Sequence, residues 1–322
     1  EHPVEASRGL AGHTDLFSPG YFEFALAGGA SSTIVAAANE EAAGPGVPAA
    51  ESGDEKVRAA TGLREAAREA MRLFVVDRDS SRTVIAGYPW FLDWGRDTLI
   101  FLRGMIAAGW TDEALDILAQ FARFEENGTL PNMIRGEDDS NRDTSDAPLW
   151  FLVACRDLAA RTGPETVRDH PAGARTLGET ARDIARGYLE GTPVGVKVDA
   201  DSGLVFSPAH FTWMDTNHPA GTPREGYPIE IQALWYAGLR WLAQLDPGDH
   251  WESLARRVRS SAQRLYRRES SPFCADTLHA RPGTPAARAK ADDALRPNQL
   301  FAVTLGLFDD PAFCRAILRD CE

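Results

Sequence analysis

From about residue 55 onward, apolar residues recur mainly at three- and four-residue spacing, which places them on one face of a helix. The segment after residue 250 shows this most clearly, with Trp251, Leu254, Val258, Ala262 and Leu265 on one stripe. We interpret such stripes as core. The pattern predicts helices at 54–76, 97–109, 111–125, 146–162, 174–190, 228–245, 248–268 and 297–306, and a further one at 310–320.

The predicted helices are joined by segments of two very different lengths. Residues 126–145, 191–227 and 269–296 are long, rich in polar and aromatic residues, and show no obvious element of their own. They alternate with tight joints at 109–111 and 245–249. This alternation indicates paired helices whose long loops gather at one end, as in an α/α toroid with a ligand at its wide mouth.

Residues 1–52 follow a different pattern. Apolar residues alternate with others over 15–26 (DLFSPGYFEFAL), and 33–38 is a second short candidate strand. We interpret 1–41 as the tail of an N-terminal β-rich domain and 42–53, which is rich in small residues, Pro and Gly, as a linker. The helical domain then covers 54–322.

Composition narrows the classes of partner. The 322 residues, 43% of them hydrophobic, suffice for a substantial core. The net charge of −13 argues against nucleic acid or an anionic membrane as a partner, and no apolar run approaches a membrane span. The four cysteines lack metal-binding spacing and are expected to be reduced thiols. Because the chain begins at Glu1 without a signal peptide, we expect a fragment or processed protein of the cytoplasm.

The densest concentration of chemically distinctive residues is 87–98, GYPWFLDWGRDT. It holds four aromatic residues, two aspartates and an arginine, and an apolar helical run follows it. Arg96 and Asp97 therefore lie where a loop enters a helix. Surrounded by aromatic rings, they suit a flat hydroxylated ligand such as a sugar. The competing interpretation is a helix-capping aspartate in an ion pair with the arginine.

Two other long loops place acidic residues beside aromatic ones. Asp215 follows Trp213 and Met214, and partial desolvation there would raise the pKa of its carboxyl group, as a general acid requires. Its alternative role is to stabilise the loop. Asp146 precedes a helix and is a capping residue by default. Glu230 begins a helix behind a proline, where either a structural or a substrate-binding role fits.

Other chemistries find little support. The seven histidines never pair at metal-ligand spacing, so His210 and His218 are interpreted as loop residues. The chain has no GxSxG elbow, phosphate-binding loop or dinucleotide fingerprint. The chain does carry carboxylates beside aromatic rings, the side chains that a glycoside hydrolase uses. Such an enzyme requires no metal or cofactor.

Five separated motifs resemble the amylo-α-1,6-glucosidase domain of glycogen debranching enzymes, in the order found in that family. They are GYPWFLDWGRDT (87–98), GTLPN (128–132), DAPLWF (146–151), TWMDT with TPREGYPIEIQALWY (212–216 and 222–236), and RPNQLFAV (296–303). The segment 15–26 also resembles the end of the β-rich domain that precedes it in bacterial members. The resemblance implies an (α/α)6 toroid that hydrolyses α-1,6-linked glucose in glycogen or limit dextrin with inversion.

The resemblance also implies roles for individual residues. Related glucoamylase-like enzymes carry the general acid after the fifth barrel helix and the base after the eleventh. If 174–190 is the fifth helix, the loop that follows it carries Asp215, which is therefore the implied general acid. Arg96 and Asp97 match the pair that binds the hydroxyls of the released glucose. Trp94 and Trp213 would supply stacking surfaces, and Asp146 and Glu230 further substrate contacts.

The resemblance leaves the toroid incomplete, with about eight or nine of its twelve helices, and places the base beyond residue 322. We therefore expect this chain alone to be inactive. Two alternatives remain open on the sequence. One is a glycan-binding protein of the same fold that performs no hydrolysis. The other is an enzyme that cleaves a different α-linkage, such as a trehalase or another α-glucosidase.

Overall fold

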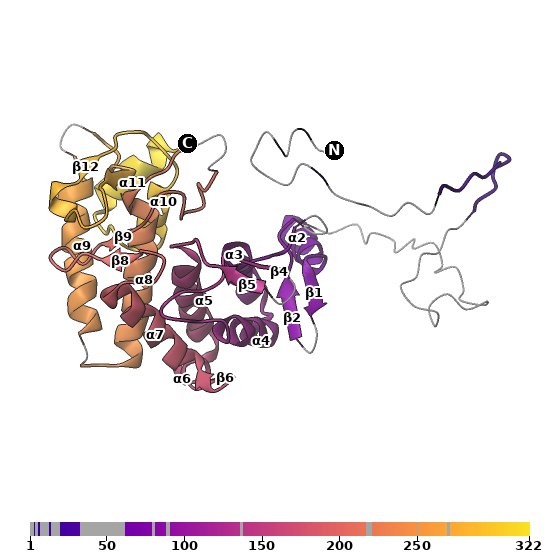
Figure 1. Ribbon diagram of the computed structural model, residues 1–322, viewed down its shortest axis with the longest axis horizontal. Helices are drawn as coiled ribbons and strands as arrows, with labels where there is room; N and C mark the ends of the chain where they lie inside the picture. The colour runs from indigo at the N-terminus through magenta and orange to yellow at the C-terminus, as the bar shows by residue number, and fades with distance from the viewer. Residues whose placement is uncertain are drawn as a thin grey trace. The chain divides into compact units, whose positions relative to one another are not determined.

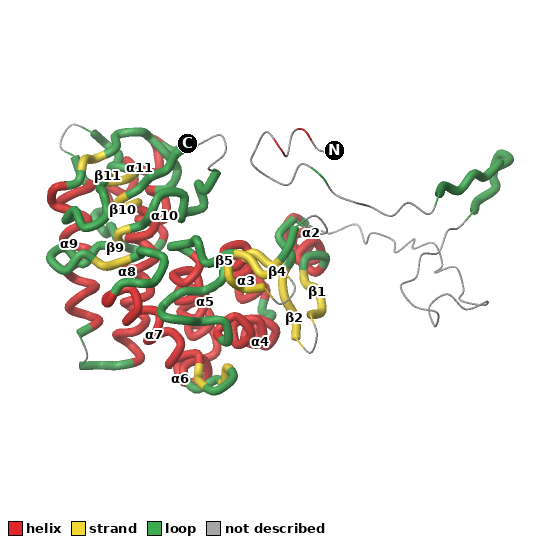
Figure 2. Tube along the Cα trace, viewed as in Figure 1, coloured by secondary structure: helices red, strands yellow, loops and turns green. Residues whose placement is uncertain are grey.

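The computed structural model describes residues 3, 6, 13, 20–32, 62–78, 81–87, 91–135, 138–216, 221–248, 250–268 and 271–322. By its internal contacts the chain divides into two units, Glu1–Ala70 and Met71–Glu322. The described residues are mainly helical, as the sequence predicts (Figure 2). None of the helices in these ranges is long and apolar enough to cross a bilayer.

In the first unit, residues 20–32 form neither helix nor strand. The strand expected over 15–26 is therefore wrong for its described part, 20–26; residues 15–19 lie outside the described ranges. Tyr21 and Phe22 are largely exposed, and the rings of Phe22 and Phe24 stack 6.4 Å apart. A strand needs a partner for its backbone hydrogen bonds, and the described residues offer this segment none. The second candidate strand at 33–38 and the linker at 42–53 lie outside the described residues, and the β-rich domain stays a prediction.

The predicted helices are confirmed in the described residues, except that the first ends at Arg72 and the strand Val75–Arg78 replaces its predicted last residues (Figure 1). They are α2 (Leu63–Arg72), α3 (Gly95–Ala108), α4 (Thr111–Ala122), α5 (Ala147–Thr162), α7 (Leu177–Glu190), α8 (Ile229–Leu245), α9 (Trp251–Tyr266), α10 (Gln299–Thr304) and α11 (Pro311–Asp320). The short α6 (Pro164–Arg168) was not expected. Residues 54–61 of the first predicted helix lie outside the described part of the chain.

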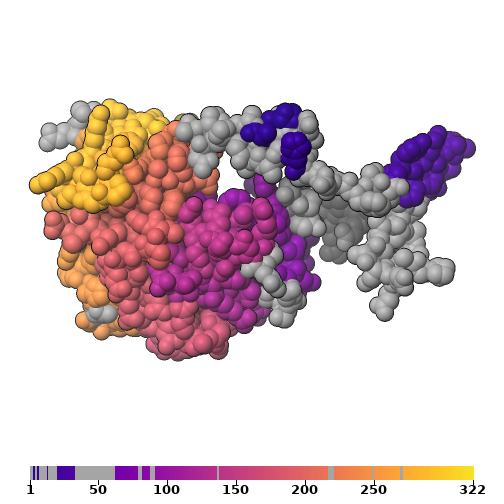
Figure 3. All heavy atoms as spheres, viewed as in Figure 1, coloured from indigo at the N-terminus to yellow at the C-terminus, as the bar shows by residue number. Residues whose placement is uncertain are grey.

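Four helices, α3, α5, α8 and α10, pack side by side in a row, and α4, α7 and α9 pack against that row. The α8 helix lies deepest, with buried residues on every face, including the fully buried Trp235 and Trp241. In the space-filling view the yellow C-terminal helices lie directly against the orange α8–α9 pair (Figure 3). Since tight joints reverse the chain after α3 and α8, the starts of the four row helices gather at one end.

Short strands organise the long loops, which contradicts our expectation that these loops lack elements of their own. Three antiparallel pairs join strands that are close in sequence: β1 (Val75–Arg78) with β2 (Ser81–Val84), β6 (Pro171–Ala172) with β7 (Arg175–Thr176), and β8 (Lys197–Val198) with β9 (Val205–Phe206). Two sheets join distant segments: β3 (Asp93–Trp94), β4 (Met133–Arg135) and β5 (Asp138–Asn141), and β10 (Gly226–Pro228), β11 (Thr277–His279) and β12 (Lys290–Ala291). The pairing partners are too far apart in sequence for local periodicity to reveal them.

One close backbone contact limits how α7 packs. A Cβ atom at Gly187 would lie 2.5 Å from Gly128 Cα and 2.7 Å from Asn127 O, both backbone atoms. Backbone cannot yield as the end of a side chain can. We therefore expect Gly187→Ala to lower the free energy of unfolding by about 1–3 kcal/mol, measured by urea denaturation.

The matched control is Gly104→Ala, also inside a helix. Its Cβ would meet only the end of the Met71 side chain, at 3.3 Å. Because alanine favours a helix over glycine by about 0.5–1 kcal/mol, this variant should be neutral or more stable. Equal destabilisation of the two variants would contradict the packing argument.

Candidate active site

The centre of the candidate site is the guanidinium of Arg96, in the first turn of α3. Its Nε donates to Asp146 Oδ2 at 2.6 Å, and its Nη1 donates to Asp215 Oδ2 at 2.9 Å. Arg96 is only 7% exposed, and its Nη2 has no protein partner within the described residues. Three candidates from distant segments thus meet at one group, with one buried donor left over for a ligand.

Asp146 occupies the N-cap position of α5, but it does not cap the helix. Thr144 takes over that function, because its Oγ1 accepts from the backbone N–H of Ala147 at 3.3 Å. The same hydroxyl donates to Asp146 Oδ1 at 2.7 Å. The capping interpretation of Asp146 is therefore wrong. Its buried carboxylate is instead oriented toward Arg96.

Asp97 follows Arg96 in α3 but does not form the ion pair that the competing interpretation expected; Arg96 pairs with Asp146 and Asp215 instead. The pKa of Asp97 is raised, chiefly because its carboxyl group is desolvated and also because Asp146 and Asp215 lie nearby, although Arg96 opposes the shift. Trp94, half-buried, occupies the N-cap position of α3. Its side chain makes no capping bond.

The other residues of the 87–98 stretch contribute less than the sequence suggested. Asp93 is buried and pairs with Arg78; burial raises its pKa and the guanidinium partly offsets this. Phe91 is 59% exposed. Tyr88 and Trp90 lie outside the described residues, so the full aromatic ring around Arg96 and Asp97 stays a prediction.

Asp215 lies beside Arg96, a partner that sequence adjacency did not predict. Its side chain is 37% exposed, and its contact is the Arg96 guanidinium. The neighbouring side chains turn toward Asn298 instead: Trp213 Nε1 donates to Asn298 Oδ1 at 2.8 Å, and Asn298 Nδ2 lies 3.6 Å from Met214 Sδ. The partial desolvation of Asp215 by these neighbours stays a prediction.

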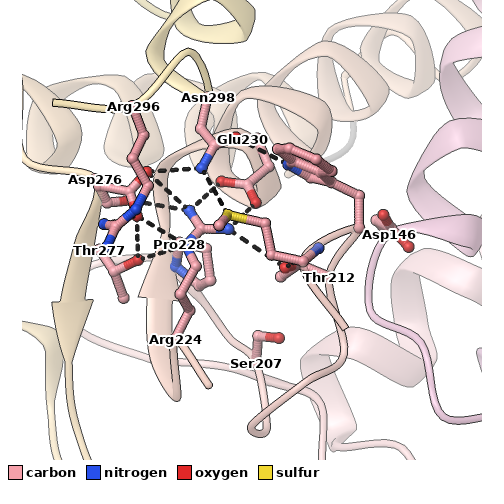
Figure 4. Close-up of polar contacts among 12 residues, drawn as sticks. Asp146, Ser207, Thr212, Arg224, Pro228, Glu230, Asp276, Thr277, Arg296 and Asn298 are labelled. Atoms are coloured by element: carbon pink, nitrogen blue, oxygen red, sulfur yellow. Dashed lines mark hydrogen bonds and ion pairs between the residues drawn. The ribbon is translucent and has the colours of Figure 1, made fainter. Parts of the chain in front are cut away.

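A second charge cluster lies beside this group, and all its members except the partly exposed Arg296 are buried (Figure 4). Arg224 holds both carboxylate oxygens of Glu230, and its Nε donates to Asp276 Oδ2 at 2.8 Å. Asp276 also accepts from Arg296 Nη1 at 2.9 Å and from Asn298 Nδ2 at 2.7 Å. Buried charges require such pairing, since each would otherwise be strongly unfavourable.

Sequence reasoning missed Arg224, Asp276, Arg296 and Asn298. Arg224 and Asn298 belong to the TPREGYP and RPNQ motifs, but nothing local pairs either motif with residue 276. Glu230 begins α8, as expected, and burial raises its pKa although Arg224 opposes the shift. With both oxygens bonded to Arg224, it holds the cluster together; its contact with substrate stays a prediction.

One cavity of about 450 Å³, within the range of small-ligand sites, is lined by Asp146 from the first group and by Glu230 and Asn298 from the second. Trp94, Arg96, Asp97 and Asp215 are not among its lining residues. Its walls are mostly apolar and come from α3, α5, α8 and α10. The lining residues are Ile100, Asp146, Trp150, Trp213, Glu230, Leu234, Pro297, Asn298, Leu300, Phe301 and Thr304. Apolar walls with a few polar groups suit a ligand that has both apolar faces and hydroxyl edges. Within the described ranges, no group of three or more His, Cys, Asp or Glu is arranged to hold a metal ion.

Comparison with known proteins gives one family match and more distant likenesses. A family model described as amylo-alpha-1,6-glucosidase matches residues 68–311. The glycogen debranching enzyme of Saccharomyces cerevisiae is 26% identical over 206 residues, which cover 47% of this chain and 13% of the yeast protein. The chain thus spans only a small part of that relative.

Two solved structures are also similar, each at 16% identity and over 70% of this chain. A GH78 family rhamnosidase of Bacillus sp. GL1 gives a TM-score of 0.49, with 22% of its own chain covered. A rhamnosidase from Klebsiella oxytoca with rhamnose bound gives 0.45, with 40% covered.

The family match extends over most of the chain and includes Arg96, Asp146, Asp215, the Arg224 cluster and Asn298. It agrees with the five motifs that indicated the same family. The chain belongs to the amylo-α-1,6-glucosidase family of glycoside hydrolases.

Proposed function

We propose that this chain forms part of an enzyme that hydrolyses α-1,6-linked glucose at the branch points of an α-glucan such as glycogen or limit dextrin. The observation that carries the proposal is the Arg96 guanidinium shared by Asp146 and Asp215 beside an apolar-walled cavity. Family membership and the likeness to a yeast glycogen debranching enzyme support the same substrate class.

Asp215 is the proposed general acid of an inverting mechanism. Such a mechanism uses one carboxylic acid to protonate the glycosidic oxygen and a second carboxylate, about 6.5–9.5 Å away, to activate water. Asp215 is partly open to solvent, so a leaving group can reach it. To act as the acid, Asp215 must first take up a proton through its open side, and its Oδ2 must exchange the Arg96 partner for the glycosidic oxygen. Asp146 holds the other side of the guanidinium in place while this happens.

The proposed substrate contacts follow from the same geometry. Arg96 Nη2 is a buried donor without a protein partner in the described residues, and with Asp97 it would bind hydroxyls of the released glucose. Trp94 and Trp213 would stack on sugar rings. Asp146 and Glu230 line the cavity and would accept hydrogen bonds from hydroxyls, since each carboxylate oxygen has two acceptor sites.

The row of α3, α5, α8 and α10 is proposed to form part of an (α/α)6 toroid. The resemblance assigns the general base to the loop after the eleventh barrel helix. On this proposal hydrolysis requires that segment.

A non-catalytic glycan-binding role is the second candidate. It is favoured by the pairing of Asp146, Glu230 and Asp276 with arginines, which stabilises carboxylates as fixed acceptors. Hydrolysis measurements on the complete protein separate the two candidates.

In the complete protein, Asp215→Asn is expected to lower glucose release from limit dextrin by about 10²- to 10⁴-fold, the usual contribution of a general acid. Glucan affinity should change little, because the amide oxygen can still accept the hydrogen bond from Arg96 Nη1. Asp201→Asn, an exposed aspartate in the β8–β9 turn, is the matched control and should leave turnover unchanged. Near-normal turnover of Asp215→Asn would exclude Asp215 as the acid.

Removing the central guanidinium should affect folding as well as binding. In Arg96→Met the buried Asp146 carboxylate loses its charged partner, so we expect the free energy of unfolding to fall by about 3–5 kcal/mol. Maltooligosaccharide binding, measured by calorimetry on the folded fraction, should be lost.

The control for this variant is Arg103→Met in the same helix. It breaks an ion pair with Asp157 whose side chains are 36% and 21% exposed, so the change should stay within about 1 kcal/mol. If both variants lose the same stability, the buried Arg96 pair does not hold the site together.

A further inference from the structure

Trp213 lies on the cavity wall with 47% of its surface exposed, in a loop without regular structure. An exposed indole on an irregular loop would ordinarily sample several rotamers. Here its Nε1 donates to Asn298 Oδ1 at 2.8 Å, which restrains the plane of the ring.

Asn298 can accept this bond in only one orientation of its amide. Its Nδ2 donates to Asp276 Oδ1 at 2.7 Å, and an ionised carboxylate can only accept. The amide nitrogen must therefore face Asp276, which leaves the amide oxygen toward Trp213. Because an indole N–H can only donate, the two partners together exclude the flipped amide.

Asp276 is itself held rigidly. It is 2% exposed and accepts from Arg224 and Arg296 as well as from Asn298 (Figure 4). A chain of contacts with fixed donors and acceptors thus runs from the buried charge cluster through Asn298 to the cavity wall.

The side chain of Asn298 does not cap its own helix, although asparagine is often a capping residue. It occupies the N-cap position of α10, yet its side chain makes no capping bond. Asparagine is among the best capping residues, and the loss of a cap typically costs about 1 kcal/mol. The 1% exposed amide is instead used between Asp276 and Trp213.

We propose that Asn298 is a positioning residue, which fixes the indole plane of Trp213 so that it forms a ready-made stacking surface for a sugar ring. The part that concerns sugar rests on the proposed function above. Asn298 lines the cavity as well, but Trp213 and Asp276 engage both polar atoms of its side chain, so we expect it to act through Trp213. A restrained ring loses less conformational freedom on binding than a mobile one, which strengthens glucan binding.

The first experiment needs no sugar. The Nε1–H resonance of Trp213 is identified in the NMR spectrum of the chain by its absence in Trp213→Phe. In Asn298→Leu we expect this resonance to shift and its exchange with solvent to accelerate about 3- to 10-fold, the loss of one hydrogen bond. An unchanged shift and exchange rate would overturn the positioning role.

The second experiment measures maltopentaose affinity by calorimetry. Asn298→Leu and Trp213→Phe should each weaken binding about 3- to 10-fold. The double variant should be little weaker than either single one, because both remove the same restraint. In the complete protein the loss should appear mainly in KM. Fully additive effects would overturn the proposal.

Gln299→Leu is the matched control, since Gln299 is an equally buried amide at the same helix start. It contacts the Cys274 N–H and the Arg296 carbonyl, and it does not line the cavity. This variant should lose stability but keep its affinity; an equal loss of affinity would show that the Asn298 effect is merely structural.

If the unaltered chain binds no glucan, the proposed function fails while the NMR result still decides whether Asn298 positions Trp213. If Asn298→Leu does not fold, Trp213→Phe against the unaltered chain decides: unchanged affinity would overturn the role of the bond.

Discussion

The site depends on one buried guanidinium that two distant carboxylates share. Burial alone would lower the pKa of Arg96, but Asp146 and Asp215 raise it, so the group stays charged. The pairing connects the start of α3 to the start of α5 and to the loop that carries Asp215. Without Arg96, Asp146 would be a buried charge with no cation, and the end of the helix row where the cavity lies could not form as observed.

The Arg224 cluster applies the same constraint to the other side of the cavity. It links the start of α8 to the β10–β11–β12 sheet through Glu230 and Asp276. Buried ion pairs contribute little net stability because desolvation offsets their attraction. Their value here is geometric. They determine which way Asn298, and through it Trp213, faces the cavity.

The helices could be predicted from the sequence because their signal is local: each apolar stripe repeats within one segment. The site residues at helix starts, Arg96, Asp146 and Glu230, could be selected for the same reason. Their partners could not. Arg224 and Asp276 are separated by 52 positions, and only folding brings them together. Asp215 shows the same limit, since its partner Arg96 lies 119 positions away and adjacency in an irregular loop could not reveal it.

Exposure separates the carboxylates around the cavity into two groups. Asp146, Glu230 and Asp276 are each 2% exposed and bonded to arginines, so they serve as fixed acceptors whose orientation requires no reorganisation when a ligand arrives. Asp215 is 37% exposed in its side chain, and Asp97 is exposed as a residue. Proton transfer to a substrate requires a group that can change partner. Among these five acids, therefore, only Asp215 and Asp97 are open enough to exchange one partner for another, and only Asp215 lies on a loop rather than within a helix.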